Sequence, residues 1–290
     1  MRYRFIDAEK ALYPIWLMCR VLEVAASGYY AWRNRGLSTR ARSNERLLVE
    51  IKAIHRKSRG TYGSPRVHRE LSAPERTVSR HRVARLMRSA GIHSKHRRKF
   101  RITTQSSHSR PIAENLVNRQ FSVERPNLVW VGDITYIRTE EGWLYLATVI
   151  DLFSRAIVGW SAGERLTDDL ALAALRMALV RRRPEPGLIY HSDRGSQYGS
   201  FEYRRLLKRN VIAQSMSRAR DCWDNAVAES FFATLKKELI GATVFTTRCA
   251  ARRELTDFIE GFYNCERLHS TLGYESPFAF EARQRMKAGA

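Results

Sequence analysis

The sequence predicts two kinds of structure in one chain: small all-helical units and, after them, an α/β domain with a mixed five-stranded sheet and helices. Three observations support this division. Before residue 123 the apolar residues recur at helical spacing, and after it strand-like apolar runs alternate with helical patterns. The charge changes at the same place, because residues 1–123 contain 27 lysines and arginines against 8 acids, whereas residues 124–290 contain 24 against 21.

The charge limits the class of partner. The 290 residues carry a formal net charge of +22. A basic front half joined to a nearly neutral back half is typical of a nucleic-acid-binding module followed by a catalytic one. A solvated basic surface or binding to anionic lipid would give the same charge, but here the cations lie on helix-turn-helix-like patterns rather than in a tail. We therefore expect DNA as the partner.

The chain lacks the signals of a membrane or secreted protein. It has no run of 18 uncharged apolar residues, and its N-terminus lacks the apolar core of a signal peptide. The four cysteines are far apart and form no C-x-x-C pair; they are Cys19, Cys222, Cys249 and Cys265. This pattern indicates reduced thiols in a cytoplasmic protein and argues against a zinc site.

The first helical unit is expected over residues 1–40. Two short helices are predicted within residues 14–35, the first begun by Pro14 and the second capped by Ser27. Residues 36–43 have the composition of a linker.

The second helical unit, residues 41–100, is predicted to be helix-turn-helix-like. Its first helix carries apolar residues at helical spacing, namely Leu47, Leu48, Ile51 and Ile54. Pro65 suits the first turn of the next helix, Ser79 caps a third, and Gly91 ends it.

The third helix of this unit presents arginines that could contact phosphates and guanine edges, or could simply form a solvated face. They are Arg80, Arg82, Arg85 and Arg88. Arg97 and Arg98, near the end of the unit, are further candidates for contact with DNA. Residues 101–123 are predicted to be a basic linker, either flexible or ordered by DNA.

The α/β domain is expected over residues 124–290. Strands are predicted at 128–138, 143–153 and 156–161, and their short links favour an antiparallel meander. Further elements follow as a helix begun by Thr167, a strand at 188–191, a helix at 201–209, a strand at 211–215, and helices at 226–239 and 251–263. This is the order of an RNase H-like domain.

Three acids fall at positions that could converge in such a domain. Asp133 lies within the first strand, Asp193 follows the fourth strand, and Glu229 lies in the first turns of the helix at 226–239. Each alone could be a hydrogen-bonded structural residue or part of a solvated face. Together they match the requirement of phosphodiester chemistry for carboxylates that hold two divalent cations with positions open to substrate.

Neighbouring polar residues receive other interpretations. Lys236 lies two turns beyond Glu229 on nearly the same line of the helix, where it could contact DNA phosphate. Asp151 is predicted to be structural, His191 to be a satisfied residue at a strand end, and Asp224 to serve the start of the long helix.

Four motifs contain the candidate residues. They are Trp130-x-x-Asp133-x-Thr135-Tyr136-Ile137, Ser192-Asp193-x-Gly195-Ser196-Gln197-Tyr198, Asp224-Asn225-Ala226-x-x-x-Glu229-Ser230-Phe231-Phe232-x-x-Leu235-Lys236 and Tyr263-Asn264-x-x-Arg267-x-His269. Together they resemble the motifs of the OrfB transposases of IS-three-type bacterial insertion sequences. The 35 residues between Asp193 and Glu229 match the D,D(35)E signature of that family. The resemblance covers about residues 13–281, with one departure, Ala73-Pro74-Glu75, where a glycine turn is expected.

The resemblance implies a DDE recombinase that uses Mg²⁺, with Mn²⁺ able to substitute, as two ions on Asp133, Asp193 and Glu229. It would free a 3′-OH at the element's terminal inverted repeats and use it to attack target DNA without a covalent protein–DNA intermediate. Lys236 would contact the terminal DNA, and Arg267 and His269 match family positions as substrate contacts or structural support.

The family also implies an upstream partner, OrfA, fused to OrfB by frameshifting in many members, and a homo-oligomer on DNA. Two alternatives remain at this stage: a metal-dependent nuclease on the same fold, and a non-enzymatic DNA-binding regulator of transposition.

Overall fold

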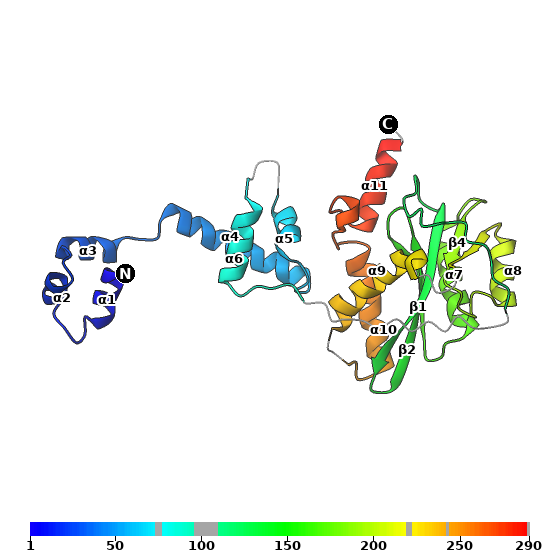
Figure 1. The fold of residues 1–290 in the computed structure, drawn as a ribbon, viewed down its shortest axis with the longest axis horizontal. Coiled ribbons are helices and arrows are strands. Elements are labelled where there is room, and N and C mark those ends of the chain that lie inside the picture. The colour runs from blue at the N-terminus through cyan, green and yellow to red at the C-terminus, as the bar shows by residue number, and fades with distance from the viewer. Residues whose placement is uncertain (73–76, 96–109, 219–221, 242–243, 289–290) are drawn as a thin grey trace.

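The computed structural model describes residues 1–72, 77–95, 110–218, 222–241 and 244–288. Two helical bodies and an α/β domain follow one another along the chain (Figure 1). The turn at Ala73-Pro74-Glu75, where the sequence departs from the family pattern, lies outside the described residues. No helix in the described ranges is both long and apolar enough to cross a membrane.

The first body contains three helices around a small core of its own. They are α1 Arg2–Glu9, α2 Ile15–Val21 and α3 Ala26–Asn34. The sequence predicted the last two and missed α1. The cap predicted at Ser27 is wrong, because α3 begins at Ala26 with Ala25 as its N-cap, and Ser27 lies inside the helix. The core consists of Ile6, Met18, Cys19 and Tyr29.

The second body has the three predicted helices, α4 Thr39–Lys57, α5 Ser64–Leu71 and α6 Arg80–Ser89. The predicted linker at 36–43 is too long, because the Ser38 hydroxyl accepts a hydrogen bond from the Ala41 amide at 3.1 Å and starts α4 there. The Ser79 hydroxyl caps α6 as predicted, and Gly91 follows the helix with φ +65°, a conformation that glycine adopts without strain.

The α/β domain holds a five-stranded sheet in the order β3-β2-β1-β4-β5. The strands are β1 Val129–Thr139, β2 Gly142–Asp151, β3 Ile157–Gly163, β4 Ile189–Ser192 and β5 Ala213–Met216. β1, β2 and β3 pair antiparallel, whereas β4 and β5 are parallel to β1. The predicted meander and mixed five-stranded sheet are confirmed.

Helices cover both faces of the sheet (Figure 1). α7 Asp168–Arg182 and α8 Phe201–Arg209 share one apolar core with the sheet. α9 Ala226–Leu235 and α10 Arg248–Thr256 share the other, which continues into residues of α4–α6. The sheet is therefore buried on both faces, as expected for strands that read as nearly continuous apolar runs.

The two predicted C-terminal helices each change form near their end. α9 continues as a π-helical turn, η2 Lys236–Ile240, and α10 continues as η3 Asp257–Tyr263. Short 3₁₀ segments η1 Cys222–Asn225 and η4 Ser270–Leu272 and the final helix α11 Pro277–Ala288 complete the described elements. π-helical turns are rare and frequently occur at functional sites.

Residues 110–123, predicted as linker, pack against the α/β domain instead. The Leu116 amide donates to the Ser215 hydroxyl at 2.9 Å, and the Met216 amide donates to the Glu114 carbonyl at 3.3 Å. Val117 is buried. This segment therefore lies along β5, the last strand of the sheet, and occupies part of its free edge. Residues 101–109 lie outside the described residues.

The second helical body contacts the C-terminal part of the α/β domain. The Tyr62 hydroxyl accepts a hydrogen bond from the Leu268 amide at 2.7 Å, and Lys95 donates to the Glu238 carbonyl at 2.8 Å. Arg59 forms an ion pair with Asp257. The second helical body is thus attached to η2, to η3 and to the loop that leaves η3.

Candidate active site and DNA-binding surface

Asp133 and Asp193 come from neighbouring parallel strands. β1 and β4 pair with Gly132 opposite Ser192, so the next residue along each segment is an acid. Each carboxylate accepts one backbone N–H, at 2.7 Å for Asp133 and 2.9 Å for Asp193. The parallel register therefore brings together two acids that are far apart in the sequence.

The side chain of Tyr190 lies so close to the backbone of β1 that the residue before Asp133 must be glycine. A Cβ at Gly132 would overlap the hydroxyl of Tyr190, which is fully buried. Tyr190 packs edge-on against Tyr203, with ring centroids 5.6 Å apart. Only glycine fits at position 132 without displacing this tyrosine.

Glu229 and Lys236 come from the helix that packs on β1. α9 buries an apolar face made of Ala228, Phe231, Phe232 and Leu235, and leaves Glu229 partly exposed in its first turn. Lys236 opens the π-helical turn, and its Nζ lies 5.3 Å from the centroid of the Tyr136 ring. The β1 strand thus faces an acid and a lysine from one helix.

Burial and neighbouring charges change the pKa values of the residues in this site. Burial first, and then the charges of Asp193 and Glu229, raise the pKa of Asp133 well above its usual value. Burial also raises the pKa of Glu229. Burial lowers the pKa of Lys236 to about 8, and the charge of Asp133 opposes that shift. The three acids therefore concentrate negative charge that a bound cation would relieve.

A groove of about 660 Å³ opens beside the two aspartates. Its walls are formed by Asp133, Ile134, Thr135, Tyr136, Trp143, Tyr145, Leu166, Asp193, Gly195, Ser196, Gln197 and Tyr198. The volume falls in the range of roughly 300–1,000 Å³ that is typical of ligand sites. The groove thus combines the two aspartates with several aromatic side chains.

Arg267 and His269 do not line the groove, and Arg267 binds Glu238 of η2. Nε and Nη2 of Arg267 each donate to the Glu238 carboxylate at 2.7 Å, and both side chains are nearly fully buried. His269 Nε2 lies 3.3 Å from Arg267 Nη1. Burial and then Arg267 lower the pKa of His269 to about 2, so its ring is neutral. The geometry favours the structural-support interpretation of both residues.

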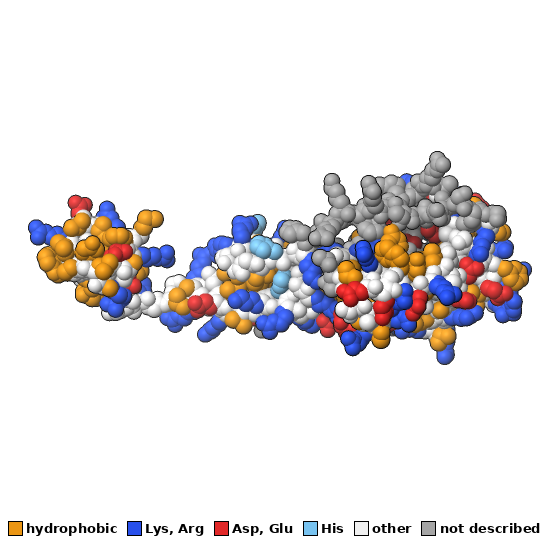
Figure 2. Space-filling view, turned by 90° about the horizontal axis from the view of Figure 1, so that it is seen from below, with side chains coloured by type: hydrophobic (Ala, Val, Ile, Leu, Met, Phe, Trp, Pro, Cys, Tyr) orange, Lys and Arg blue, Asp and Glu red, His pale blue; other side chains and the backbone are white. Residues whose placement is uncertain are grey.

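The candidate arginines of α6 divide into two groups. Arg80, Arg85 and Arg88 are exposed. Arg82 donates to the Asn44 side chain and the Ser43 hydroxyl, both at 2.8 Å, and so holds α6 against α4. Figure 2 shows lysine and arginine side chains spread over the helical bodies, with few acids among them. Arg97 and Arg98 lie outside the described residues.

Three other polar residues of the domain are structural. The Asp151 carboxylate accepts backbone N–H groups from Asn127 and Phe153, and both ring nitrogens of His191 lie within hydrogen-bond distance of serine hydroxyls, as predicted. The role predicted for Asp224 is wrong. It does not cap α9; it is buried and accepts hydrogen bonds from Arg218 and Arg119, which hold its pKa below the usual value.

Comparison with known proteins gives the family. Models of the integrase core domain match residues 123–222 and 210–277, and a model of the HTH-like domain matches residues 42–100. Transposase InsF for insertion sequence IS3A of Escherichia coli K12 is 44% identical over 283 residues, which cover 97% of this chain and 98% of InsF. The chain belongs to the IS3-type transposase family.

Two further proteins are similar to this chain. A 31 kDa protein of insertion element IS600 from Shigella sonnei is 46% identical over 271 residues, 93% of this chain and 100% of that protein. Among solved structures, the catalytic core domain of HTLV-2 integrase in complex with magnesium is 18% identical, covers 54% of this chain and 97% of that one, and has a TM-score of 0.41.

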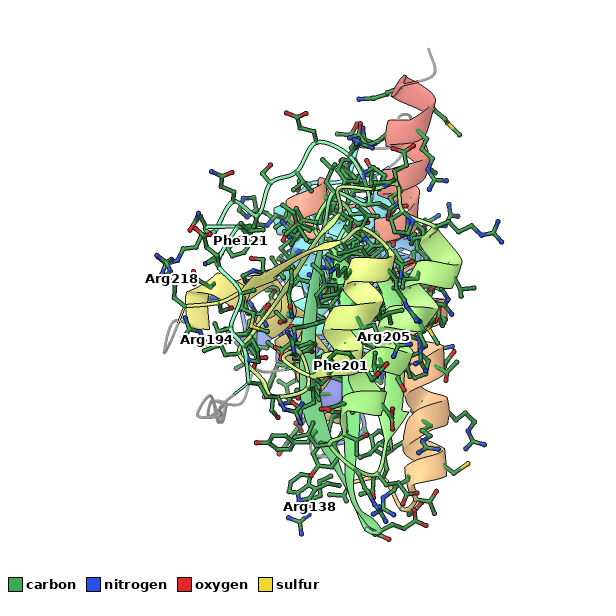
Figure 3. All side chains as sticks on the ribbon, turned by 90° about the vertical axis from the view of Figure 1, so that its right-hand side faces the viewer. Phe121, Arg138, Arg194, Phe201, Arg205 and Arg218 are labelled. Atoms are coloured by element: carbon green, nitrogen blue, oxygen red, sulfur yellow. The ribbon has the colours of Figure 1, made fainter. Side chains whose placement is uncertain are left out.

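The transposase domain carries further arginines that the sequence analysis did not single out. Arg194 and Arg218 lie toward one side of the domain, and Arg138 lies at its lower end (Figure 3). Arg194 directly follows Asp193 and donates to the Ser217 carbonyl at 2.8 Å, and Arg138 is exposed. The adjacency of Arg194 to a candidate acid was a usable signal, whereas only the fold places Arg218 on the same side of the domain as Arg194.

Proposed function

We propose that this transposase cleaves DNA at the ends of its element and joins the freed 3′-OH directly to another phosphodiester. The observation that carries the proposal is the meeting of Asp133 and Asp193 through the parallel register of β1 and β4, opposite the helix that holds Glu229. Family membership supports the same reaction class. The enzyme would act on chromosomal DNA in the bacterial cytoplasm.

Asp133, Asp193 and Glu229 would hold Mg²⁺ or Mn²⁺. Their oxygen donors suit these hard cations. Burial and then the charges of Asp193 and Glu229 raise the pKa of Asp133, and bound cations would offset both effects. Within the described ranges, no three His, Cys, Asp or Glu side chains already form a metal cage. A pair of divalent ions, when bound, would activate the attacking oxygen and stabilise charge on the leaving oxygen.

Cations of the chain would position the DNA. Lys236, whose ammonium lies over the Tyr136 ring, would contact a phosphate near the acids. The exposed Arg80, Arg85 and Arg88 would contact the terminal repeat, while Arg82 holds the helix that presents them.

Strand cleavage and joining on labelled element-end DNA, with Mg²⁺ or Mn²⁺, test the proposal. Wild type should give metal-dependent joined products, and Asp193→Asn and Glu229→Gln should each abolish them. Glu202→Gln is a matched control, because Glu202 is an exposed acid on α8 that pairs only with Arg205 among the described residues. If joined products survive in one of the two variants, the acid replaced in that variant is not part of the active site.

The same assay separates the alternatives. Cleavage without joining would favour a metal-dependent nuclease, and DNA binding without either product would favour a regulator. We propose OrfA as the upstream partner and an oligomer on the DNA ends. A fusion of OrfA to this chain should raise the rate of cleavage. If neither the fusion nor the unfused wild type gives products, the non-enzymatic DNA-binding regulator is favoured.

A further inference from the structure

The groove beside the acids has an apolar wall, called here the aromatic wall, which consists of the rings of Tyr136, Trp143 and Tyr145 and of the aliphatic Leu166. All four line the groove that also contains Asp133 and Asp193. Trp143 is 46% exposed and Leu166 is 48% exposed, although both are large and apolar. Single exposed apolar residues are common on protein surfaces, but a contiguous set that lines a cavity next to reactive groups indicates a binding site.

The wall is held in place by the strand register. Tyr136 on β1 lies opposite Tyr145 on β2, and Trp143 lies opposite Arg138, two residues further along β1. The rings of Tyr136 and Trp143 meet edge to face, with centroids 5.0 Å apart and an angle of 83°. This contact orients the indole without covering it.

The fold does not need these rings for its core. Neither Tyr136 nor Trp143 belongs to the buried clusters that hold the described part of the chain together. Trp143 is followed on β2 by buried Leu144, which does serve the core. A tryptophan beside the groove is thus left available for substrate.

We propose that the aromatic wall binds one unstacked nucleobase of the bound DNA, next to the phosphodiester that reacts. A paired and stacked base exposes only its edges in the grooves of the duplex, whereas a wall of ring faces suits the face of a base that has left the stack. Lys236 supports this. Its ammonium lies over the Tyr136 ring, 5.3 Å from the ring centroid, and that ring meets Trp143, so the lysine would place a phosphate next to a base stacked on the indole.

The polar side of the groove fits the same ligand. Thr135, Ser196 and Gln197 line it and carry donors and acceptors suited to the edge of a base. Base–aromatic stacking tolerates every sequence because every base has a π-face, so the wall would secure the DNA strand without by itself reading its sequence.

The inference rests on the proposed function for the identity of the DNA, but its test measures binding and not activity. The full chain carrying Asp193→Asn is bound to labelled element-end duplexes in which single nucleotides near the cleavage position are made abasic, one at a time. Trp143→Ala should weaken binding of the intact duplex by about 5- to 150-fold, the range of one base–aromatic stack. On the duplex that is abasic at the contacted position, the parent chain and Trp143→Ala should bind equally well, because the base that Trp143 would stack on is already absent.

Controls separate stacking from folding. Trp143→Tyr keeps an aromatic face and should stay within about threefold of the parent. Phe201→Ala removes an aromatic that is 67% exposed on α8, outside the groove, and should change nothing (Figure 3). A Trp143→Ala penalty that persists at every abasic position, or no penalty on intact DNA, would overturn the proposal. If the Trp143→Ala penalty vanishes at one abasic position but neither the wild type nor its OrfA fusion joins strands, the base site is upheld and the proposed function is refuted.

Discussion

Replacement of Arg267 by methionine tests whether its buried ion pair with Glu238 sets the stability of this end of the domain. Arg267 and Glu238 make two hydrogen bonds of 2.7 Å, and their side chains are only 6% and 3% exposed. Glu238 lies in η2, two residues from Lys236. The pair therefore connects the helix that carries the candidate site to the segment on which the second helical body rests.

The expected cost comes from the charge that is left behind. Arg267→Met leaves the Glu238 carboxylate buried without its main partner, a change that typically costs ~3–5 kcal/mol. Arg66 is also near enough for its pKa to respond to both Arg267 and Glu238. Because that second cation offsets part of the lost attraction, we expect the lower end of the range, about 3 kcal/mol of unfolding free energy.

Urea unfolding followed by circular dichroism measures this change. The matched control is Arg205→Met, which breaks an ion pair with Glu202 that is 44% and 57% exposed and should change the unfolding free energy by less than about 1 kcal/mol (Figure 3). The double variant Arg267→Met with Glu238→Met removes both charges and should recover most of the loss. A loss no larger than the control's, or a double variant as unstable as Arg267→Met alone, would refute the reasoning.

Three further predictions concern the site and its support. Lys236→Met should weaken binding of element-end DNA and reduce its salt dependence by about one phosphate contact, whereas Lys237→Met should leave both unchanged; a salt titration of each variant compares them. Burial raises the pKa of Asp151 to about 6, above its unfolded value of 3.8, so the folded state binds the proton more tightly and the unfolding free energy should rise as pH falls from about 7 to about 4. Asp151→Asn should make the unfolding free energy depend less on pH over this range. Gly132→Ala should cost about 1–3 kcal/mol through overlap with the Tyr190 hydroxyl, and Tyr190→Phe in the same chain should restore part of it, which thermal unfolding would detect.

Local sequence patterns predicted most of the architecture. Alternating and continuous apolar runs predicted all five strands, because strand burial is visible in consecutive residues, and short links implied the antiparallel pairs β1–β2 and β2–β3. Caps such as Ser79 were predictable because the hydroxyl bonds an amide only three residues away. The same locality explains why α1, with no strong cap or apolar stripe, was missed.

The partners of distant residues required the tertiary structure. The sequence by itself determined the charge division, the order of the elements and the three candidate acids, because each depends on residue type and short-range spacing. It could not determine that Asp224 binds Arg218 and Arg119, that Arg82 holds α4, or that Trp143 stays exposed in a groove. Those facts depend on which surfaces meet after folding. Asp224 and Arg119 are 105 positions apart, and Arg82 and Asn44 are 38 apart, and contacts at such separations leave no periodic trace in the chain.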